Sequence, residues 1–155
     1  MQRMILSFLL SSGFALLSTG LVVAQESETK VKLKNLPPTV QKTVQEQSQG
    51  AKIRGLAKET EKGQTYYEVE LLVKGHGKDV LIDPTGKVVA IEEEIALNDA
   101  PAAVKAALTK QTGKGRLTKL ETITKNSTLE YYEARIKTGL KTREVKVDPE
   151  GKVIP

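Results

Sequence analysis

The feature that most constrains the fold of this chain is an internal repeat. The stretch YYEVELLVKGHGKDVLIDPTGKV at residues 66–88 returns as YYEARIKTGLKTREVKVDPEGKV at residues 131–153, and LPPTVQKTV at residues 36–44 returns as APAAVKAAL at residues 100–108. The first pair is separated by 65 residues and the second pair by 64 residues. The motifs therefore occur in the same order and at nearly the same spacing in both copies. Such a period is typical of a duplicated supersecondary unit, and a unit of about 60 residues is marginal alone because it buries too little surface. We therefore predict two copies that pack together.

Each copy has the pattern of a helix followed by four strands. Asn35 and Asp99 are placed to cap a helix, and prolines follow in the expected first turn. Beyond each helix, apolar and polar residues alternate with the period of half-buried strands, and Asp83 opens an Asp-Pro-Thr-Gly type I turn. The sequence predicts an α+β fold of two tandem helix-plus-antiparallel-sheet repeats (α-β-β-β-β each), at residues 25–97 and 98–155.

The first 24 residues have the composition of a signal peptide. Arg3 is followed by an apolar run without acidic residues, and Val22-Val23-Ala24 suits cleavage after Ala24. The alternative is an uncleaved membrane anchor, since the run approaches the roughly 20 residues of a spanning helix, but its Ser, Thr and Gly content favours removal. We predict residues 1–24 as a signal peptide and expect a periplasmic or secreted protein with no stable membrane anchor after cleavage.

The charge of the chain is unevenly distributed. The full chain has a formal net charge of +5. Residues 25–97 hold 11 basic and 12 acidic residues, whereas residues 98–155 hold 12 basic and 7 acidic residues, so the second copy carries the basic character. There is no cysteine, which excludes disulfides, thiol catalysis and thiolate metal sites.

Successive residues of a strand point to opposite faces of the sheet, so the two neighbouring tyrosines of each copy are expected to point in opposite directions. Tyr67 shares its parity with the apolar Val69, and Tyr132 has the matching position in the second copy. We therefore predict that Tyr67 and Tyr132 belong to the core. Tyr66 and Tyr131 are predicted to point outward.

The outer face of the predicted sheet is the candidate binding surface. It changes from acidic and partly apolar in the first copy to basic in the second, and a face graded in charge is suited to docking. Its tyrosines strengthen this interpretation, because tyrosine is favoured in binding surfaces, although a solvated face without a partner is the common case. The candidate partner-binding residues are Tyr66, Glu68, Glu70, Leu72, Tyr131, Glu133, Arg135 and Lys137.

The sequence lacks the residue groups of common catalytic and metal sites. His76, the only histidine, lies between two glycines and has no further ligands for a zinc site or partners for a triad. Glu68 and Glu70 share a face, but carboxylate pairs on exposed strands are seldom glycosidic acids. An EF-hand spacing fails at Lys87 and Val88, and the modest net charge disfavours nucleic acid. We expect no catalytic residues, no metal and no cofactor.

The LPPTV and APAAV helix starts, the YYEVE and YYEAR strands and the IDPTGKV and VDPEGKV turns together resemble the PepSY-like family of exported bacterial proteins. The resemblance covers nearly all residues after the predicted signal peptide, twice, and extends to tandem proteins like the β-lactamase inhibitory protein. It implies a helix packed on a small antiparallel sheet in each repeat, an association with the inhibition or regulation of peptidases, and no catalytic residues. The chain lacks the disulfides and the aromatic-rich outer face of the β-lactamase inhibitor, so inhibition of a β-lactamase is not implied.

These observations predict a non-enzymatic, exported binding or regulatory protein of the cell envelope. Its expected partner is an envelope protein such as a peptidase, bound through the outer sheet face. The alternative is a small-molecule or glycan-binding module with a cleft between the repeats, and a weaker one is a hydrolase that uses Glu68 or Glu70. The sequence leaves the oligomeric state open.

Overall fold

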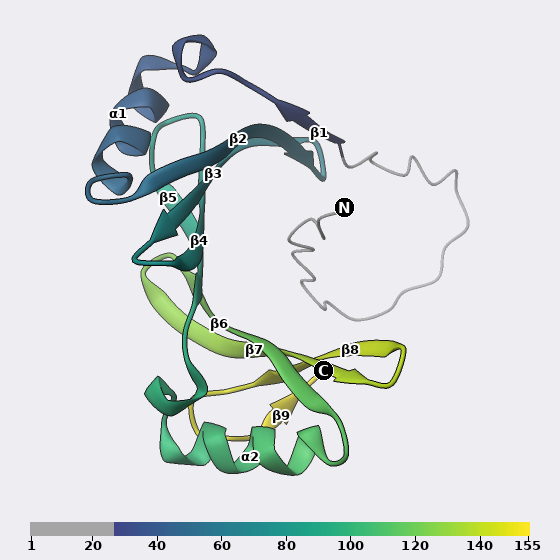
Figure 1. Cartoon of the computed structure of the whole chain (residues 1–155). Coiled ribbons are helices and arrows are strands. Elements are labelled where there is room, and N and C mark those ends of the chain that lie inside the picture. The colour runs from purple at the N-terminus through teal and green to yellow at the C-terminus, as the bar shows by residue number, and fades with distance from the viewer. Residues whose placement is uncertain (1–26) are drawn as a thin grey trace, which may run out of the picture.

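The computed structural model describes residues 27–155, which form one antiparallel sheet with both helices on the same face (Figure 1). The nine strands of these residues pair in sequence order. The strands are β1 (Ser27–Lys30), β2 (Lys52–Glu61), β3 (Gln64–Val73), β4 (His76–Ile82), β5 (Val88–Glu94), β6 (Arg116–Lys125), β7 (Thr128–Thr138), β8 (Lys141–Val147) and β9 (Val153–Ile154). The helices are α1 (Pro38–Gln47) and α2 (Ala102–Thr112). The predicted α+β class is confirmed, whereas the predicted signal peptide at residues 1–24 lies outside the described residues.

The two halves of the chain share this one sheet. We call β1 to β5 with α1 the N-terminal half, and α2 with β6 to β9 the C-terminal half. Strand β5 pairs with β6, with Ala90 opposite Lys125 and Glu94 opposite Glu121. This pairing removes two open sheet edges, which are a liability because they expose unpaired backbone groups. The sequence predicts a small sheet in each copy; it indicates neither this edge-to-edge joining nor β1, which pairs with β2.

The two helices begin later than the capping residues suggested. Asn35 and Asp99 do not cap the helices; they lie in short 3-10 turns, η1 (Leu33–Asn35) and η2 (Leu97–Asp99). The N-cap positions are instead Pro37 and Pro101, neither of which makes a side-chain cap hydrogen bond. Proline fits this position because its fixed backbone angle and missing N–H do not disturb the first turn.

Each helix covers its own half of the sheet. Helix α1 packs Val40 and Val44, and α2 packs Val104 and Leu108, against the inward residues of the strands. Two separate core clusters result. The buried members of the first are Leu36, Val40, Val44, Val69, Leu71, Val80 and Ile82, and those of the second are Ala100, Val104, Leu108, Leu120, Tyr132, Ala134, Ile136, Val145 and Val147. The predicted inward parity of both sets of strands is confirmed.

The tyrosine prediction holds fully in one half. Tyr132 is buried in the C-terminal core, with Thr122 and Val147 as its cross-strand neighbours. Tyr67 is only partly buried, although it packs against the N-terminal core. The difference follows from its neighbour across the strand, because Tyr67 pairs with the exposed Lys58.

The repeated Asp-Pro-x-Gly-Lys-Val motif forms a turn that lies against the start of each helix. In the first copy, Oδ1 of Asp83 accepts hydrogen bonds from the backbone N–H groups of Thr85 (2.9 Å) and Lys87 (3.0 Å). Although burial opposes it, these bonds and one from the Thr85 hydroxyl lower the pKa of Asp83. Gly86 has a φ of +91°, and a Cβ there would lie 2.9 Å from the carbonyl oxygen of Thr39 in α1.

We expect Gly86→Ala to lower the free energy of unfolding by about 2 to 4 kcal/mol, from the positive φ and the collision with α1 together. Gly75→Ala is the matched control, since Gly75 has a φ of +92° but open space around it. It should cost about 1 kcal/mol. Urea unfolding measures both, and an equal loss in the two variants would show that the contact with α1 does not restrict this position.

Candidate functional site

All eight predicted site residues lie on the sheet face that carries no helix. The register shows this, because Glu68 is opposite Leu81 on β4 and Glu133 is opposite Lys146 on β8, while the core residues alternate with them. The sheet bends around this face (Figure 1), which we call the inner face. Seven of the eight are partly buried, and Lys137 is exposed.

A row of apolar side chains runs beneath the charged groups of the inner face. Leu81 is 5% exposed, Ala90 is 2% exposed and Ile123 is 1% exposed, yet none of them belongs to either core cluster of the described residues. Their parity places them on the inner face, so neighbouring side chains of that face cover them. The burial of Leu81 was not predicted from the sequence, although an apolar residue at a position of outward parity is the signal that could have indicated it.

Carboxylates face one another across the strands of the inner face. In one row, Glu70 of β3 is opposite Asp79 of β4, which is opposite Glu92 of β5. In the next row, Glu94 of β5 is opposite Glu121 of β6, which is opposite Glu133 of β7. Like charges directly opposite one another destabilise a sheet. We call these side chains the acidic ladder, whose members are Glu70, Asp79, Glu92, Glu94, Glu121 and Glu133.

Sequence reasoning found two members of the acidic ladder, Glu70 and Glu133, and missed the other four. Glu92 and Glu94 lie in an acidic run at residues 92–94, but nothing in the sequence shows which strand pairs with this run. The pairing of β5 with β6, which brings Glu94 beside Glu121, has no counterpart in the sequence pattern.

The environment of the ladder favours the protonated form of several carboxyls. Burial raises the pKa of Glu92 to about 8, and the nearby Glu121, Glu133 and Asp79 add to the shift, while Lys119 opposes it. Burial also raises the pKa of Glu133, and Glu144 contributes in the same direction. Glu92 is therefore mostly protonated at neutral pH, and Glu133 takes up a proton more readily than an ordinary glutamate.

A small hollow opens among these carboxyls in the N-terminal half. Its lining residues are Glu59, Glu68, Asp79, Leu81, Ala90 and Glu92. Burial raises the pKa of Glu59, against a lowering by its hydrogen bond to the carboxyl of Glu68. The hollow thus combines four carboxyls with two apolar side chains, and β2 to β5 of one half supply all of them.

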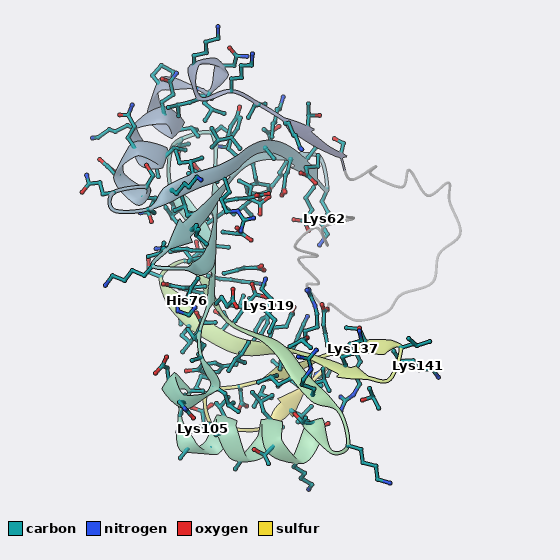
Figure 2. All side chains as sticks on the ribbon, viewed as in Figure 1. Lys62, His76, Lys105, Lys119, Lys137 and Lys141 are labelled. Carbon is teal, nitrogen blue, oxygen red and sulfur yellow. The ribbon has the colours of Figure 1, made fainter. Side chains whose placement is uncertain are left out.

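Basic side chains dominate the inner face in the C-terminal half, where they alternate with acidic partners. The amine of Lys119 lies 2.5 Å from Oε1 of Glu121, and the Arg135 guanidinium lies 3.2 Å from Oε1 of Glu144. Figure 2 shows Lys119 and Lys137 on the side of the sheet away from α2. The charge gradient predicted from the sequence is thus present on one continuous surface.

Tyr131 of β7 lies between two lysines, one strand away from the junction of the halves. The amines of Lys125 and Lys146 are 5.8 Å and 5.3 Å from the centre of its ring, within the range of cation–π attraction. Its cross-strand neighbour is the buried Ile123. Burial, then Glu133 and Glu92, raise the pKa of Tyr131 to about 12. Tyr66 lies at the other end of the face, where its hydroxyl donates a hydrogen bond to Oε1 of Gln64.

Although four carboxyls line the hollow, their arrangement does not form a metal site. Within residues 27–155, no group of three or more His, Asp or Glu side chains is placed to hold a metal ion. His76 is exposed at the start of β4. No helix in the same part of the chain is long and apolar enough to cross a membrane.

Comparison with solved structures places the fold among bacterial proteins of the genus Bacteroides. A protein of Bacteroides eggerthii, provisionally assigned to the periplasm, has a TM-score of 0.65 at 18% identity, covering 77% of this chain and 86% of that one. A DUF2874 family protein of Bacteroides uniformis has a TM-score of 0.63 at 17% identity, covering 77% and 86%. A BLIP-like protein of Bacteroides fragilis has a TM-score of 0.59 at 18% identity, covering 77% and 84%. At these identities the likeness concerns the fold.

Comparisons at the level of sequence give no relative. No protein-family model matches the chain, and no curated protein matches it. The PepSY-like resemblance therefore stays a prediction, whereas the BLIP-like fold is supported by the solved structures.

Proposed function

We propose that this chain is a non-enzymatic binding protein of the cell envelope that captures another protein on its inner face. The observation that carries the proposal is the continuous helix-free face, acidic in one half and basic in the other. Complementary charge steers a partner into one orientation, and Tyr66 and Tyr131 supply aromatic groups of the kind enriched at interfaces. The sheet bends around this face, so the face suits a convex partner.

The proposal includes export to the cell envelope and membership of the PepSY-like family. A leader of signal-peptide composition at residues 1–24 and the provisional periplasmic assignment of a structural neighbour both support export. The motifs shared with PepSY-like proteins, and the recurrence of a helix followed by four strands (α1 with β2 to β5, α2 with β6 to β9), support a duplicated PepSY-like unit. A peptidase of the envelope is the partner that this resemblance favours. A ligand cleft between the repeats has less support, because the hollow on the inner face is lined by one half alone.

Capture of an envelope protein by face variants tests the proposal. We expect that Arg135→Glu with Lys137→Glu, or Tyr66→Ala with Tyr131→Ala, lowers the amount of the specific partner recovered from envelope extract by about tenfold or more, as for loss of central interface contacts. Lys42→Glu with Lys110→Glu is the matched control, since it makes the same charge change on the exposed sides of α1 and α2. Recovery should not change in this control.

Thermal unfolding of each variant separates binding from folding. The Arg135–Glu144 ion pair is partly exposed, so its loss should cost no more than about 1 kcal/mol. Undiminished capture by both face variants, with folding intact, would move the binding site away from the inner face.

A further inference from the structure

The turn between β7 and β8 carries a leucine that lies wholly in solvent. Leu140 is 100% exposed. Strands β7 and β8 pair as far as Thr138 and Lys141, so Gly139 and Leu140 alone form the loop of this hairpin. Gly139 has a φ of +59°, of the kind that tight hairpin turns require. The side chain of Leu140 has no part in either core, so the fold does not explain why this residue is apolar.

The other tight hairpin turns of the described residues have no apolar side chain at the tip. Their loops are Lys62-Gly63, Lys74-Gly75 and Asn126-Ser127. In the first copy of the repeat, the position that corresponds to Leu140 is Gly75. Glycine and polar residues are usual in exposed turns. A single exposed leucine is common on protein surfaces, but the surroundings of Leu140 set it apart.

Exposed lysines and arginines surround this turn. Arg116 at the start of β6 is opposite Lys137 near the end of β7. The guanidinium of Arg143 on β8 donates a hydrogen bond to the carbonyl oxygen of Gln111, which joins the hairpin to the end of α2. Figure 1 shows the turn at the outer end of the β7–β8 hairpin, and Figure 2 shows Lys137 and Lys141 beside it. We call these exposed side chains the basic collar, whose members are Lys110, Lys114, Arg116, Lys137, Lys141 and Arg143.

No acidic side chain compensates the basic collar. The two segments that form this end of the molecule have no acidic residue, either between Asp99 and Glu121 or between Glu133 and Glu144. Within residues 27–155, no member of the collar forms an ion pair. Like charges directly opposite one another, as on β6 and β7 here, destabilise a sheet. An anionic partner would relieve this repulsion.

We infer that this end of the molecule binds reversibly to the surface of a bilayer that contains anionic phospholipid. Leu140 enters the boundary between headgroups and acyl chains, and the basic collar contacts the lipid phosphates. Basic clusters are attracted to anionic bilayers, and apolar side chains beside them enter that boundary. The inference goes beyond the proposed function, because it concerns another surface and needs no protein partner.

The shape and composition of this end favour lipid over other anionic partners. An acidic protein needs a matching pocket for the protruding Leu140, whereas a fluid bilayer admits a protruding side chain at any point. Sites that bind nucleic acid without reading its sequence stack bases on aromatic side chains. No aromatic residue occurs at residues 109–119 or 134–143, which carry the collar and the turn.

Sedimentation with lipid vesicles measures the binding. The full chain is expressed for export, and the form recovered from the soluble envelope fraction is used, because the apolar run of residues 1–24 can itself bind lipid. We expect the protein to sediment with vesicles of phosphatidylglycerol and phosphatidylcholine in equal parts, and to stay in solution with phosphatidylcholine alone. Binding should weaken as salt is added, because salt screens exposed charges.

Neutral variants locate the charges that act. Each lysine or arginine near an anionic bilayer contributes roughly fivefold to the binding constant. Lys114→Gln with Arg116→Gln and Lys141→Gln should therefore weaken binding by about tenfold or more. The matched control is Lys34→Gln with Lys52→Gln and Arg54→Gln, which removes two lysines and one arginine that are exposed in the N-terminal half. The control should bind within about twofold of the unaltered protein, since distant exposed charges are screened.

The leucine is tested by removal and by a fluorescent replacement. Leu140→Ser should weaken binding by about tenfold, with the melting temperature unchanged because the side chain is fully exposed. The chain has no tryptophan, so Leu140→Trp supplies a single fluorophore at the tip. Its emission should shift to the blue on adding the anionic vesicles, and brominated lipid should quench it. Leu129→Trp is the control, since Leu129 is an exposed leucine at the opposite end of β7. Its emission should not change.

The outcomes separate a bilayer surface from other partners. Equal weakening in the collar and control variants, or no binding to the anionic vesicles, would overturn the inference. So would tighter binding to a short DNA duplex that Leu140→Ser leaves unchanged, because the collar would then recognise a polyanion and not a bilayer. Lys137 belongs both to the collar and to the candidate partner-binding residues, so it is left unaltered in these variants. Failure here therefore leaves capture of a protein by the inner face untouched.

Discussion

Replacement of Tyr132 by alanine is expected to lower the free energy of unfolding by about 3 to 5 kcal/mol, the usual loss for a large aromatic side chain in a core. Tyr132 is 5% exposed and belongs to the C-terminal core with Leu108 and Val147. Its removal leaves a cavity that the neighbouring strands cannot close, because both are held by backbone pairing. Urea unfolding followed by circular dichroism measures the loss.

The adjacent Tyr131 supplies the matched control for that experiment. It lies on the inner face and is only partly buried, but its ring contacts Lys125 and Lys146 and it pairs with Ile123. We expect Tyr131→Ala to cost about 1 kcal/mol, more than a fully solvated tyrosine and much less than Tyr132. If both variants lose the same stability, Tyr132 is not the core residue of this pair.

The second large effect concerns pH. In the unfolded chain Glu92 has an ordinary pKa near 4.5, whereas in the folded protein its pKa is about 8, so the folded state binds the proton more tightly. The free energy of unfolding must therefore fall as the pH rises from about 4.5 to about 8, and stay flat above that range. Each tenfold change in proton affinity is worth about 1.4 kcal/mol, which gives a total of about 3 to 5 kcal/mol. Glu133 and Glu59, whose pKa values are also raised, contribute in the same direction.

Glu92→Gln should remove most of this pH dependence and raise the melting temperature at pH 8 and above. Glu93→Gln is the control on the same strand, since it faces the helix side of the sheet. Asp83, whose pKa is lowered, acts in the opposite direction but at acid pH, outside this window. The measurement is the melting temperature of each variant between about pH 5 and 9. If Glu92→Gln leaves the pH dependence unchanged, Glu92 does not have the raised pKa that its place on the inner face implies.

Much of the local structure follows from the sequence because it depends on short-range patterns. Alternation of apolar residues predicts strands, and it assigns Val69, Leu71, Ala134 and Ile136 correctly to the core. The Asp-Pro-x-Gly motif predicts a turn, and the structure adds the reason for its glycine, which is contact with a helix backbone. Helix starts were less predictable, since prolines after Asn35 and Asp99 delay the first turn.

The rest could not be predicted because it depends on pairings between distant strands. Backbone pairing of β5 with β6 has no side-chain signature, yet it joins the two halves and completes the acidic ladder. Parity assigns Leu81 to the outward face, where its neighbours across the sheet bury it. The eight candidate residues were correctly placed on one face, but which of them a partner contacts is a question for experiment.

Photocrosslinking in the intact cell envelope tests the central claim, that the inner face is a protein-binding surface, most directly. A photoreactive phenylalanine analogue in place of Tyr66 or Tyr131 sits on that face, whereas the same analogue in place of Lys42 or Ala106 sits on the exposed side of a helix. The account predicts a discrete crosslinked product, of one partner protein, from the two tyrosine positions and none from the two helix positions. A product from the helix positions alone would contradict it.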